Sequence, residues 1–302
     1  MASSTRRQFL KYSAALAAVA ATQRSSLLHA SALGLPIGLQ LFSVREFLAK
    51  DYAGTLKKVG ALGFKEVEAA GFFDHSPADV KTAMADAGLR CVSAHYSSQN
   101  LYPHVDEVIE YGNALGLDFI VCSSPARKDP SSLKDTAHKA MQNAFTMDDW
   151  HWNAEQFNAI GTKVAAAGMH FAYHNHTTEF RAKDGPTPFE ELLRLTDPTK
   201  VSFEMDCGWV VVGGGDPQDL LRRYPNRFSM LHVKDFKSTT ASPTGEPPAS
   251  AEMGQGVLDN LGIFAAAKHA HIRHCFVEQE GFDMPPFESL KIDADYVAKL
   301  KS

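Results

Sequence analysis

The chain has 302 residues and a mass of 33.0 kDa, with 44% hydrophobic and 22% charged residues. This composition is typical of a globular protein and excludes a largely disordered chain. The formal net charge of −5 argues against a basic, phosphate-binding surface, so we expect no nucleic-acid partner. None of the four cysteines forms a Cys-x-x-Cys pair, which argues against a thiolate zinc site.

The N-terminal segment carries a targeting pattern. An Arg6-Arg7 pair precedes a modest apolar run, and Ala30-Ser31-Ala32 offers a small-x-small cleavage site. The segment resembles a bacterial twin-arginine export signal, so we predict that residues 1–32 are a signal peptide and that residues 33–302 form the mature domain. An amphipathic N-terminal helix is the alternative. Because the apolar run is too short for a stable transmembrane helix, we expect no stable membrane insertion after processing.

Export would bring the protein to the periplasm or outside the cell, where disulfides are permitted. Loss of residues 1–32 removes four basic and no acidic side chains, which leaves 26 basic against 35 acidic side chains and a net charge of −9. Each cysteine sits in an apolar, strand-like run, so we expect buried thiols, with a disulfide as the alternative, at Cys91, Cys122, Cys207 and Cys275.

From residue 37 onward, short apolar runs alternate with amphipathic stretches. The predicted strands are Ile37–Phe42, Phe64–Ala69, Leu89–His95, Phe119–Ser123, His170–His174, Val201–Asp206, Phe228–Val233 and His274–Glu278. The predicted helices are Tyr52–Leu62, Pro77–Ala87, Val105–Leu115, Ala154–Ala167, Phe189–Leu195, Pro217–Tyr224, Leu258–His269 and about Phe287–Leu300. Near-continuous apolar strands are typical of parallel sheets that are covered on both faces.

Eight strand–helix units in one chain predict a single-domain α/β fold, a (β/α)8 TIM barrel. An open doubly wound sheet is the alternative, but no Gly-x-Gly-x-x-Gly motif follows the first strand. Two connections are long: residues 124–149, with an expected extra helix at Ser131–Phe145, and residues 237–257. Both would lie at the catalytic end of a barrel, as a lid or as a passive insertion.

Polar side chains capable of binding a metal end the apolar runs. In a barrel the carboxyl ends of the strands meet at one mouth, so these side chains should converge there. A mixture of imidazole and carboxylate ligands suits Mn²⁺, Zn²⁺, Co²⁺ or Fe²⁺ better than Ca²⁺. The residues in question are Glu68, His95, His174, His176, Glu179, Glu204, Asp206, His232, Glu278 and Glu280. Lys234 lies at the same strand end as His232 and is a candidate to hold a substrate oxygen.

Several of these residues also have structural interpretations. His174 and His176 could be hydrogen-bonded core histidines, and Lys234 could be an exposed lysine instead of a ligand for a substrate oxygen. Trp209 is either a core residue or a sugar-stacking platform. Glu204 shares a strand face with Asp206, so it is a candidate to lie one layer deeper and orient a ligand.

In combination, these stretches resemble the xylose isomerase-like TIM barrel superfamily, the sugar phosphate isomerase/epimerase group, and within it the inosose dehydratase-like members. The resemblance rests on motifs that span the mature chain in order: Gly38-Leu39-Gln40-Leu41-Phe42-Ser43-Val44-Arg45, Ala172-Tyr173-His174-Asn175-His176 with Glu179-Phe180, Phe203-Glu204-Met205-Asp206 with Trp209, Leu231-His232-Val233-Lys234-Asp235, Gly254-Gln255-Gly256 and Val277-Glu278-Gln279-Glu280.

The resemblance implies one divalent metal ion, held by a Glu, Asp, His, Glu set that here corresponds to Glu179, Asp206, His232 and Glu278. The first ligand has three candidates. Many relatives end strand five with a Glu-Pro motif, but here His174 stands near that place, so His174 or His176 could replace Glu179. We expect proton transfer by His176, Glu278 and His174. We expect substrate contacts from Glu68, His95, Trp209, Lys234 and Glu280.

These residues predict a divalent-metal-dependent enzyme that moves a proton α to a carbonyl of a sugar or cyclitol. The outcome would be isomerisation, epimerisation or β-elimination, so the enzyme class is isomerase/epimerase or lyase, and a keto-sugar or keto-glycoside suits an exported enzyme. A non-catalytic carbohydrate-binding barrel is the alternative. An endonuclease IV-like phosphodiesterase fits the acidic net charge poorly. A homo-oligomer is left open.

Overall fold

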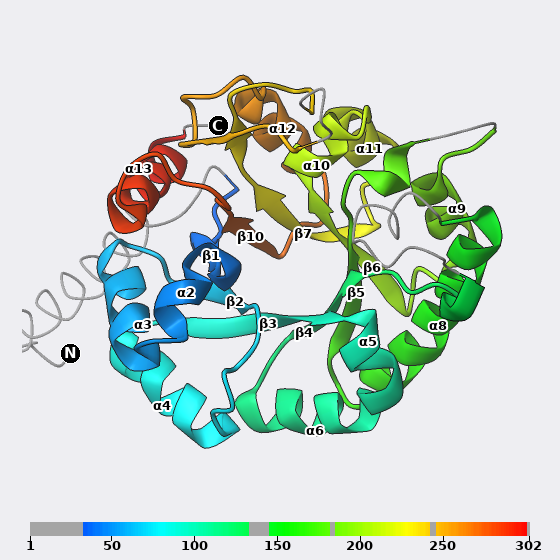
Figure 1. Cartoon of the computed structure of the whole chain (residues 1–302), viewed down its shortest axis with the longest axis horizontal. Coiled ribbons are helices and arrows are strands. Elements are labelled where there is room, and N and C mark those ends of the chain that lie inside the picture. The colour runs from blue at the N-terminus through cyan, green and yellow to red at the C-terminus, as the bar shows by residue number, and fades with distance from the viewer. Residues whose placement is uncertain (1–32, 133–144, 182–184, 242–245, 301–302) are drawn as a thin grey trace, which may run out of the picture.

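The computed structural model describes residues 33–132, 145–181, 185–241 and 246–300. Within these residues, eight parallel strands close into a barrel in the order β1-β10-β7-β6-β5-β4-β3-β2. A ring of helices surrounds the strands, and β1 lies beside β10, so the two ends of the domain complete the circle (Figure 1). The predicted single-domain TIM barrel is confirmed.

The barrel strands are β1 Gly38–Gln40, β2 Glu66–Ala69, β3 Arg90–Ser97, β4 Phe119–Ser124, β5 His170–His174, β6 Val201–Asp206, β7 Phe228–Val233 and β10 His274–Val277. The helices are α2 Arg45–Leu48, α3 Tyr52–Ala61, α4 Pro77–Ala87, α5 Ser98–Leu101, α6 Val105–Leu115, α8 Met147–Ala166, α9 Pro188–Leu195, α10 Cys207–Val212, α11 Pro217–Arg223, α12 Asn260–Ala267 and α13 Pro286–Lys299. Short 3₁₀ turns include Leu41–Val44 and Thr178–Phe180.

Helix ends follow local sequence signals. Thr146 and Asp149 form a capping box at the start of α8, which therefore begins earlier than the predicted Ala154. Gly88 and Gly116 end α4 and α6 in the left-handed conformation, with φ of 68° and 85°, as their position after each helix predicts.

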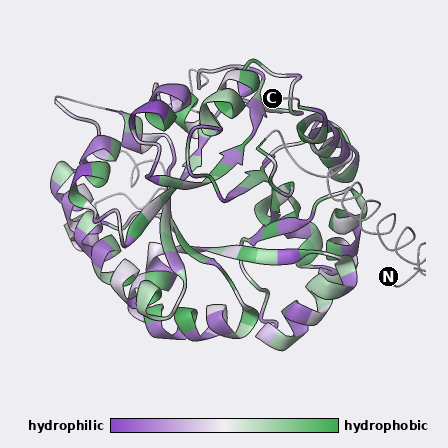
Figure 2. Cartoon of the chain, turned by 180° about the vertical axis from the view of Figure 1, so that it is seen from behind, coloured by the Kyte–Doolittle hydropathy of each residue, from purple (hydrophilic) through white to green (hydrophobic). Residues whose placement is uncertain are grey.

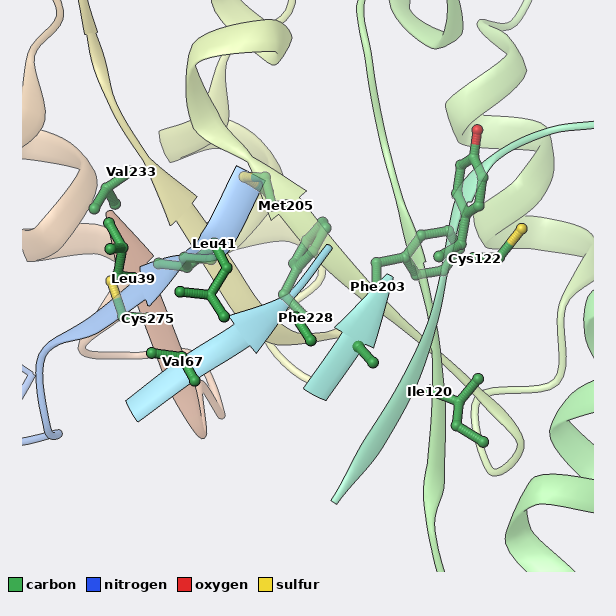
Figure 3. Packing of buried hydrophobic residues seen from close by; sticks show 14 of the residues in the cluster. Leu39, Leu41, Val67, Ile120, Cys122, Phe203, Met205, Phe228, Val233 and Cys275 are labelled. Atoms are coloured by element: carbon green, nitrogen blue, oxygen red, sulfur yellow. The ribbon is translucent and has the colours of Figure 1, made fainter. Parts of the chain in front are cut away.

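The outward faces of the strands and the inward faces of the helices form one buried cluster. Leu39, Val67 and Ile120 of the strands belong to it (Figure 3). Leu56 of α3 and Phe157 of α8 belong to the same cluster. Both hydrophobic and hydrophilic residues occur along the outer helices, as expected for amphipathic helices that cover a barrel (Figure 2). The helices cover the outer face of each strand, and the inner face is enclosed within the barrel. The strands are therefore apolar on both faces.

The inside of the barrel contains an apolar plug, defined here as six fully buried residues from five strands. On β5, β7 and β10 the plug residue lies two positions before a polar residue of the mouth, so the plug is one layer further down the barrel. Gly38 leaves room for the ring of Phe276, because a Cβ at this position would collide with Phe276 Cδ1. The plug consists of Val92, Phe119, Val121, Ala172, Met230 and Phe276.

Charged residues lie at the opposite end of the barrel from the mouth. His274 Nδ1 is 2.7 Å from Glu66 Oε2, and Arg90 donates to both carboxylate oxygens of Asp118 at 2.8 Å. These contacts join β10, β2 and β3 to the segment before β4. We interpret this network as structural, because the plug separates it from the mouth.

The two long connections are described in part. The predicted helix at Ser131–Phe145 lies almost entirely outside the described residues. In the 237–257 connection, Ser250–Ala251 (β9) pairs antiparallel with Asp235–Phe236 (β8). The Asp235 carboxylate accepts hydrogen bonds from the backbone N–H groups of Gly254, Gly256 and Leu258 at 3.0–3.1 Å, and so it holds this connection against β7.

All four cysteines are buried and none is in a disulfide. Burial raises the pKa of the Cys91, Cys122 and Cys275 thiols to about 12. Among the described helices, none combines the length and the apolar character needed to cross a membrane.

Candidate active site

The predicted polar side chains converge at the mouth because of strand register. His174 pairs with Glu204 across β5 and β6, and Asp206 pairs with His232 across β6 and β7. Since alternate residues of a strand face the same side, Glu204 and Asp206 both point into the barrel, one below the other. The site therefore has two layers.

In the deep layer, two buried carboxylates hold three histidines. Glu204 Oε2 lies 2.7 Å from His95 Nε2, 3.0 Å from His174 Nδ1 and 3.2 Å from His232 Nε2. Glu68 Oε1 lies 2.9 Å from His95 Nε2 and 2.7 Å from His232 Nε2. Both carboxylates have no solvent exposure. One oxygen of Glu204 thus contacts a ring nitrogen of all three histidines.

The charges of the deep layer follow from these contacts. Burial by itself would lower the pKa of His95, but Glu68 and Glu204 outweigh it and raise that pKa to about 9. The same balance raises the pKa of His232 well above its ordinary value. Burial lowers the pKa of His174 well below 6.5, despite its hydrogen bond to Glu204. His95 is therefore a cation and hydrogen-bond donor, whereas His174 is a neutral imidazole.

The outer layer is built around Lys234. Its Nζ lies 2.8 Å from Asp206 Oδ2, 2.6 Å from Glu278 Oε2 and 2.8 Å from Glu280 Oε1. Burial opposes the charge on Lys234, but Asp206 and Glu278 outweigh it and raise the pKa of the ammonium well above 10.5. Burial likewise opposes ionisation of Glu278, but Lys234 and His232 hold the pKa of that carboxyl well below its usual range.

Two overlapping sets of side chains in the described residues could hold a metal ion. Ligand atoms of Asp206, His232 and Glu278 lie within 4.8 Å of one another, and so do those of His95, His174, Glu204 and His232. Three carboxylates of the outer layer face one ammonium, so this layer carries excess negative charge. The first set combines imidazole nitrogen with carboxylate oxygen, which fits a divalent transition metal.

Glu179 lies apart from both sets, although we predicted it as a ligand. Its Oε1 accepts hydrogen bonds from Tyr173 OH at 2.7 Å and from the His176 backbone N–H at 2.9 Å, and its Oε2 accepts one from Thr178 Oγ1 at 2.9 Å. The carboxylate is fully buried. These bonds fix the turn after β5 and thereby the position of His176.

A cavity of about 620 Å³ lies over the two layers. Its wall includes several residues that we predicted as site residues: His95, His174, His176, Trp209, Glu278 and Glu280. A second cavity of about 380 Å³ adjoins it and shares Ser97, Ser123 and His176 with the first. Glu68, Asp206, His232 and Lys234 lie beneath, with no more than 3% exposure.

The structure adds wall residues that sequence reasoning missed. Phe42, Phe72, Tyr96, Ser97, Asn100, His104 and Ser123 line the larger cavity. Phe42 is 38% exposed and follows β1. It belongs to the Gly38–Arg45 motif of the family resemblance, and this motif was the only sequence signal that could have pointed to it. Gln40, in the same motif, donates from Nε2 to Glu68 Oε1 at 2.7 Å and so belongs to the deep layer.

Comparisons with known proteins agree with this architecture. Residues 56–300 match the family of xylose isomerase-like TIM barrels. Residues 3–22 match the signal sequence of the twin-arginine translocation pathway, which confirms the predicted export signal.

Several individual proteins are similar to this chain. The inosose dehydratase of Geobacillus thermodenitrificans is 26% identical over 259 residues, a match that covers 77% of this chain and 84% of the relative. A sugar phosphate isomerase/epimerase from Parabacteroides distasonis has a TM-score of 0.71 at 26% identity, covering 87% of this chain and 98% of that one. The E. coli 3-keto-D-glucoside 4-epimerase shares the fold, with a TM-score of 0.64 at 14% identity, covering 88% of this chain and 100% of that one. The chain belongs to the xylose isomerase-like TIM barrel family.

Proposed function

We propose that this protein is a divalent-metal-dependent isomerase, epimerase or lyase that moves a proton α to a carbonyl of a sugar or cyclitol. The observation that carries the proposal is the buried, two-layered arrangement of imidazoles and carboxylates beneath a cavity of about 620 Å³. Buried ionisable groups at the base of a cavity are characteristic of catalytic sites.

The ligands that fit a metal ion best are Asp206, His232 and Glu278, with His174 as the fourth. His174 Nε2 lies 4.0 Å from Asp206 Oδ2, whereas the carboxylate of Glu179 is occupied by its three hydrogen bonds. When bound, a divalent ion would hold oxygens of a hydroxyketone and stabilise the negative charge that develops as the α proton leaves.

The deep layer orients these ligands. Glu204 takes up Nδ1 of His174, which leaves Nε2 directed toward Asp206. Glu68 takes up Nε2 of His232, which leaves Nδ1 3.3 Å from Glu278 Oε2. Hydrogen bonds of this kind fix the ring orientation and the tautomer of a ligand histidine.

Proton transfer falls to side chains that reach the cavity. His176 lies in the wall of both cavities, its ring centroid 4.9 Å from that of His174, and we assign it as one acid/base group. Glu278 and His174 also line the cavity and are the other candidates, but as proposed metal ligands they come second to His176 in this role. His95, as a cation, would donate a hydrogen bond to a substrate oxygen, and Trp209 provides an apolar face for a sugar ring.

The relatives and the signal sequence support the proposed substrate class. Curated relatives bear the name inosose dehydratase, which favours elimination from a keto-cyclitol or keto-sugar. The export signal favours a periplasmic or secreted enzyme, where a keto-sugar or keto-glycoside is a more suitable substrate than a phosphosugar.

Solvent deuterium exchange tests this function. Keto-sugars and keto-cyclitols are incubated with the mature protein and Mn²⁺ in D₂O, and incorporation at the carbon next to the carbonyl is followed by NMR. We expect exchange with the wild type, and loss of at least about 100-fold in His176→Gln and Asp206→Asn. Binding without exchange in the wild type would instead identify a carbohydrate-binding barrel.

A further inference from the structure

Lys234 lies inside the site and not on its rim. The side chain is 3% exposed, and its Nζ is within 2.8 Å of a carboxylate oxygen from each of Asp206, Glu278 and Glu280. Asp206 and Glu278 belong to the proposed ligand set. The ammonium therefore contacts the carboxylates of two of the three side chains that could hold a metal ion, through Asp206 Oδ2 and Glu278 Oε2.

The fold provides a path for this lysine. A Cβ at Gly208 would lie 2.5 Å from Lys234 Cγ and 2.8 Å from Lys234 Cδ, so the lysine chain passes directly over the glycine. The ammonium also lies 4.7 Å from the centre of the Trp209 ring. Gly208 and Trp209, at the start of α10, thus guide the lysine into the outer layer.

The three carboxylates around Lys234 differ in their access to the cavity. Asp206 has no exposure, whereas the Glu280 side chain is 34% exposed and lines the cavity. Two cations cannot share the inner pair of oxygens, because their mutual repulsion is strong in a buried site. Glu280 offers the ammonium a second place, further out, without breaking this ion pair.

We propose that Lys234 is a displaceable internal cation. It neutralises Asp206 and Glu278 while no metal is bound, and it moves outward to Glu280 and the cavity when a metal ion takes its place. Metal affinity is then set by competition with the protein's own ammonium. The inference rests on the proposed metal-dependent function, and it adds that metal loading brings a cationic donor to the substrate.

Titration calorimetry with Mn²⁺ alone tests the competition. We expect Lys234→Met to bind Mn²⁺ at least about ten-fold more tightly than the wild type, because the competing charge is gone. Lys237→Met is the matched control: this lysine is half exposed, pairs with Asp283 and should leave Mn²⁺ affinity unchanged. Equal or weaker binding by a folded Lys234→Met variant would overturn the proposal.

A second variant covers the case in which Lys234→Met fails to fold. Glu280→Gln removes the outer place for the ammonium without removing a proposed ligand, so Mn²⁺ binding should weaken by at least about three-fold. Unchanged or tighter binding would contradict displacement. If the wild type binds Mn²⁺ and neither variant shifts the affinity, only the competition is wrong. If no variant binds Mn²⁺, Zn²⁺ or Co²⁺, the metal-dependent function is wrong as well.

Discussion

Replacement of Glu204 by glutamine should destabilise the barrel by about 3–5 kcal/mol, the usual cost of removing one partner from a buried ion pair. Glutamine keeps the shape of the side chain and an acceptor oxygen, but it loses the negative charge that faces the His95 cation, and its amide N–H₂ would take the place of the buried Oε1, which has no hydrogen-bond partner. Glu204 is fully buried, and its Oε2 lies within 3.2 Å of a ring nitrogen of His95, His174 and His232. No water can replace the lost charge at such a position.

Equilibrium unfolding in urea, with the metal-free protein near neutral pH, measures this loss. In a thermal scan, at about 2–4 °C per kcal/mol for a domain of this size, the melting temperature should fall by roughly 6–20 °C. Glu155→Gln is the matched control, because Glu155 is exposed on α8 and its replacement should change stability by no more than about 0.5 kcal/mol.

A second readout follows the charge itself. In the wild type the pKa of His95 is raised to about 9, partly by Glu204, so an imidazole NMR titration of Glu204→Gln should show it lower. A stability loss below about 1 kcal/mol, together with an unchanged His95 titration, would refute the reasoning that this carboxylate holds the deep layer together.

Three further outcomes are expected. Gly38→Ala should destabilise the barrel by about 1–3 kcal/mol in urea, because its Cβ would lie 2.4 Å from Phe276 Cδ1; an unchanged midpoint would contradict that packing. Asp235→Ala should expose the 237–257 connection to limited proteolysis, since the carboxylate accepts its backbone N–H groups, and equal cleavage rates would argue against this anchor. Burial, with help from Glu252, raises the pKa of Asp293 to about 7. The protonated carboxyl therefore favours the folded state below the unfolded pKa of 3.8, and this stability is lost as the pH rises through about 7. Wild-type stability should fall over that range more than that of Asp293→Asn, and parallel profiles would exclude the effect.

Strand positions were predictable where an apolar run ends in a polar residue at the mouth. The bounds of β5, β6 and β7 agree with the predicted ranges for this reason. β1 ends at Gln40 instead of Phe42, because the Gln40 side chain accepts a hydrogen bond from Phe42 N–H and starts a 3₁₀ turn. The pattern of hydrophobic residues carries no information about a hydrogen bond of this kind.

The convergence of the candidate residues at one mouth was predictable, but their contacts were not. Strand-end placement brought Asp206 and His232 to one mouth, as expected for parallel strands. The partners of Glu179 depend on Tyr173 and on the turn after β5, which no spacing rule describes. Likewise, the ion pairs of Lys234 arise from the convergence of β6, β7 and the segment after β10.

The apolar plug closes the barrel below the site, so the site is open at one end only within the described residues. Its six side chains have no exposure, so the two layers of the site have, among the described residues, the cavity above them and packed hydrocarbon below. Within the described part of the chain, the path to the inner carboxylates leads through the cavity that a substrate would fill. A metal ion would therefore have to load before the substrate and leave after the product, and exchange of the ion should slow whenever the cavity is occupied.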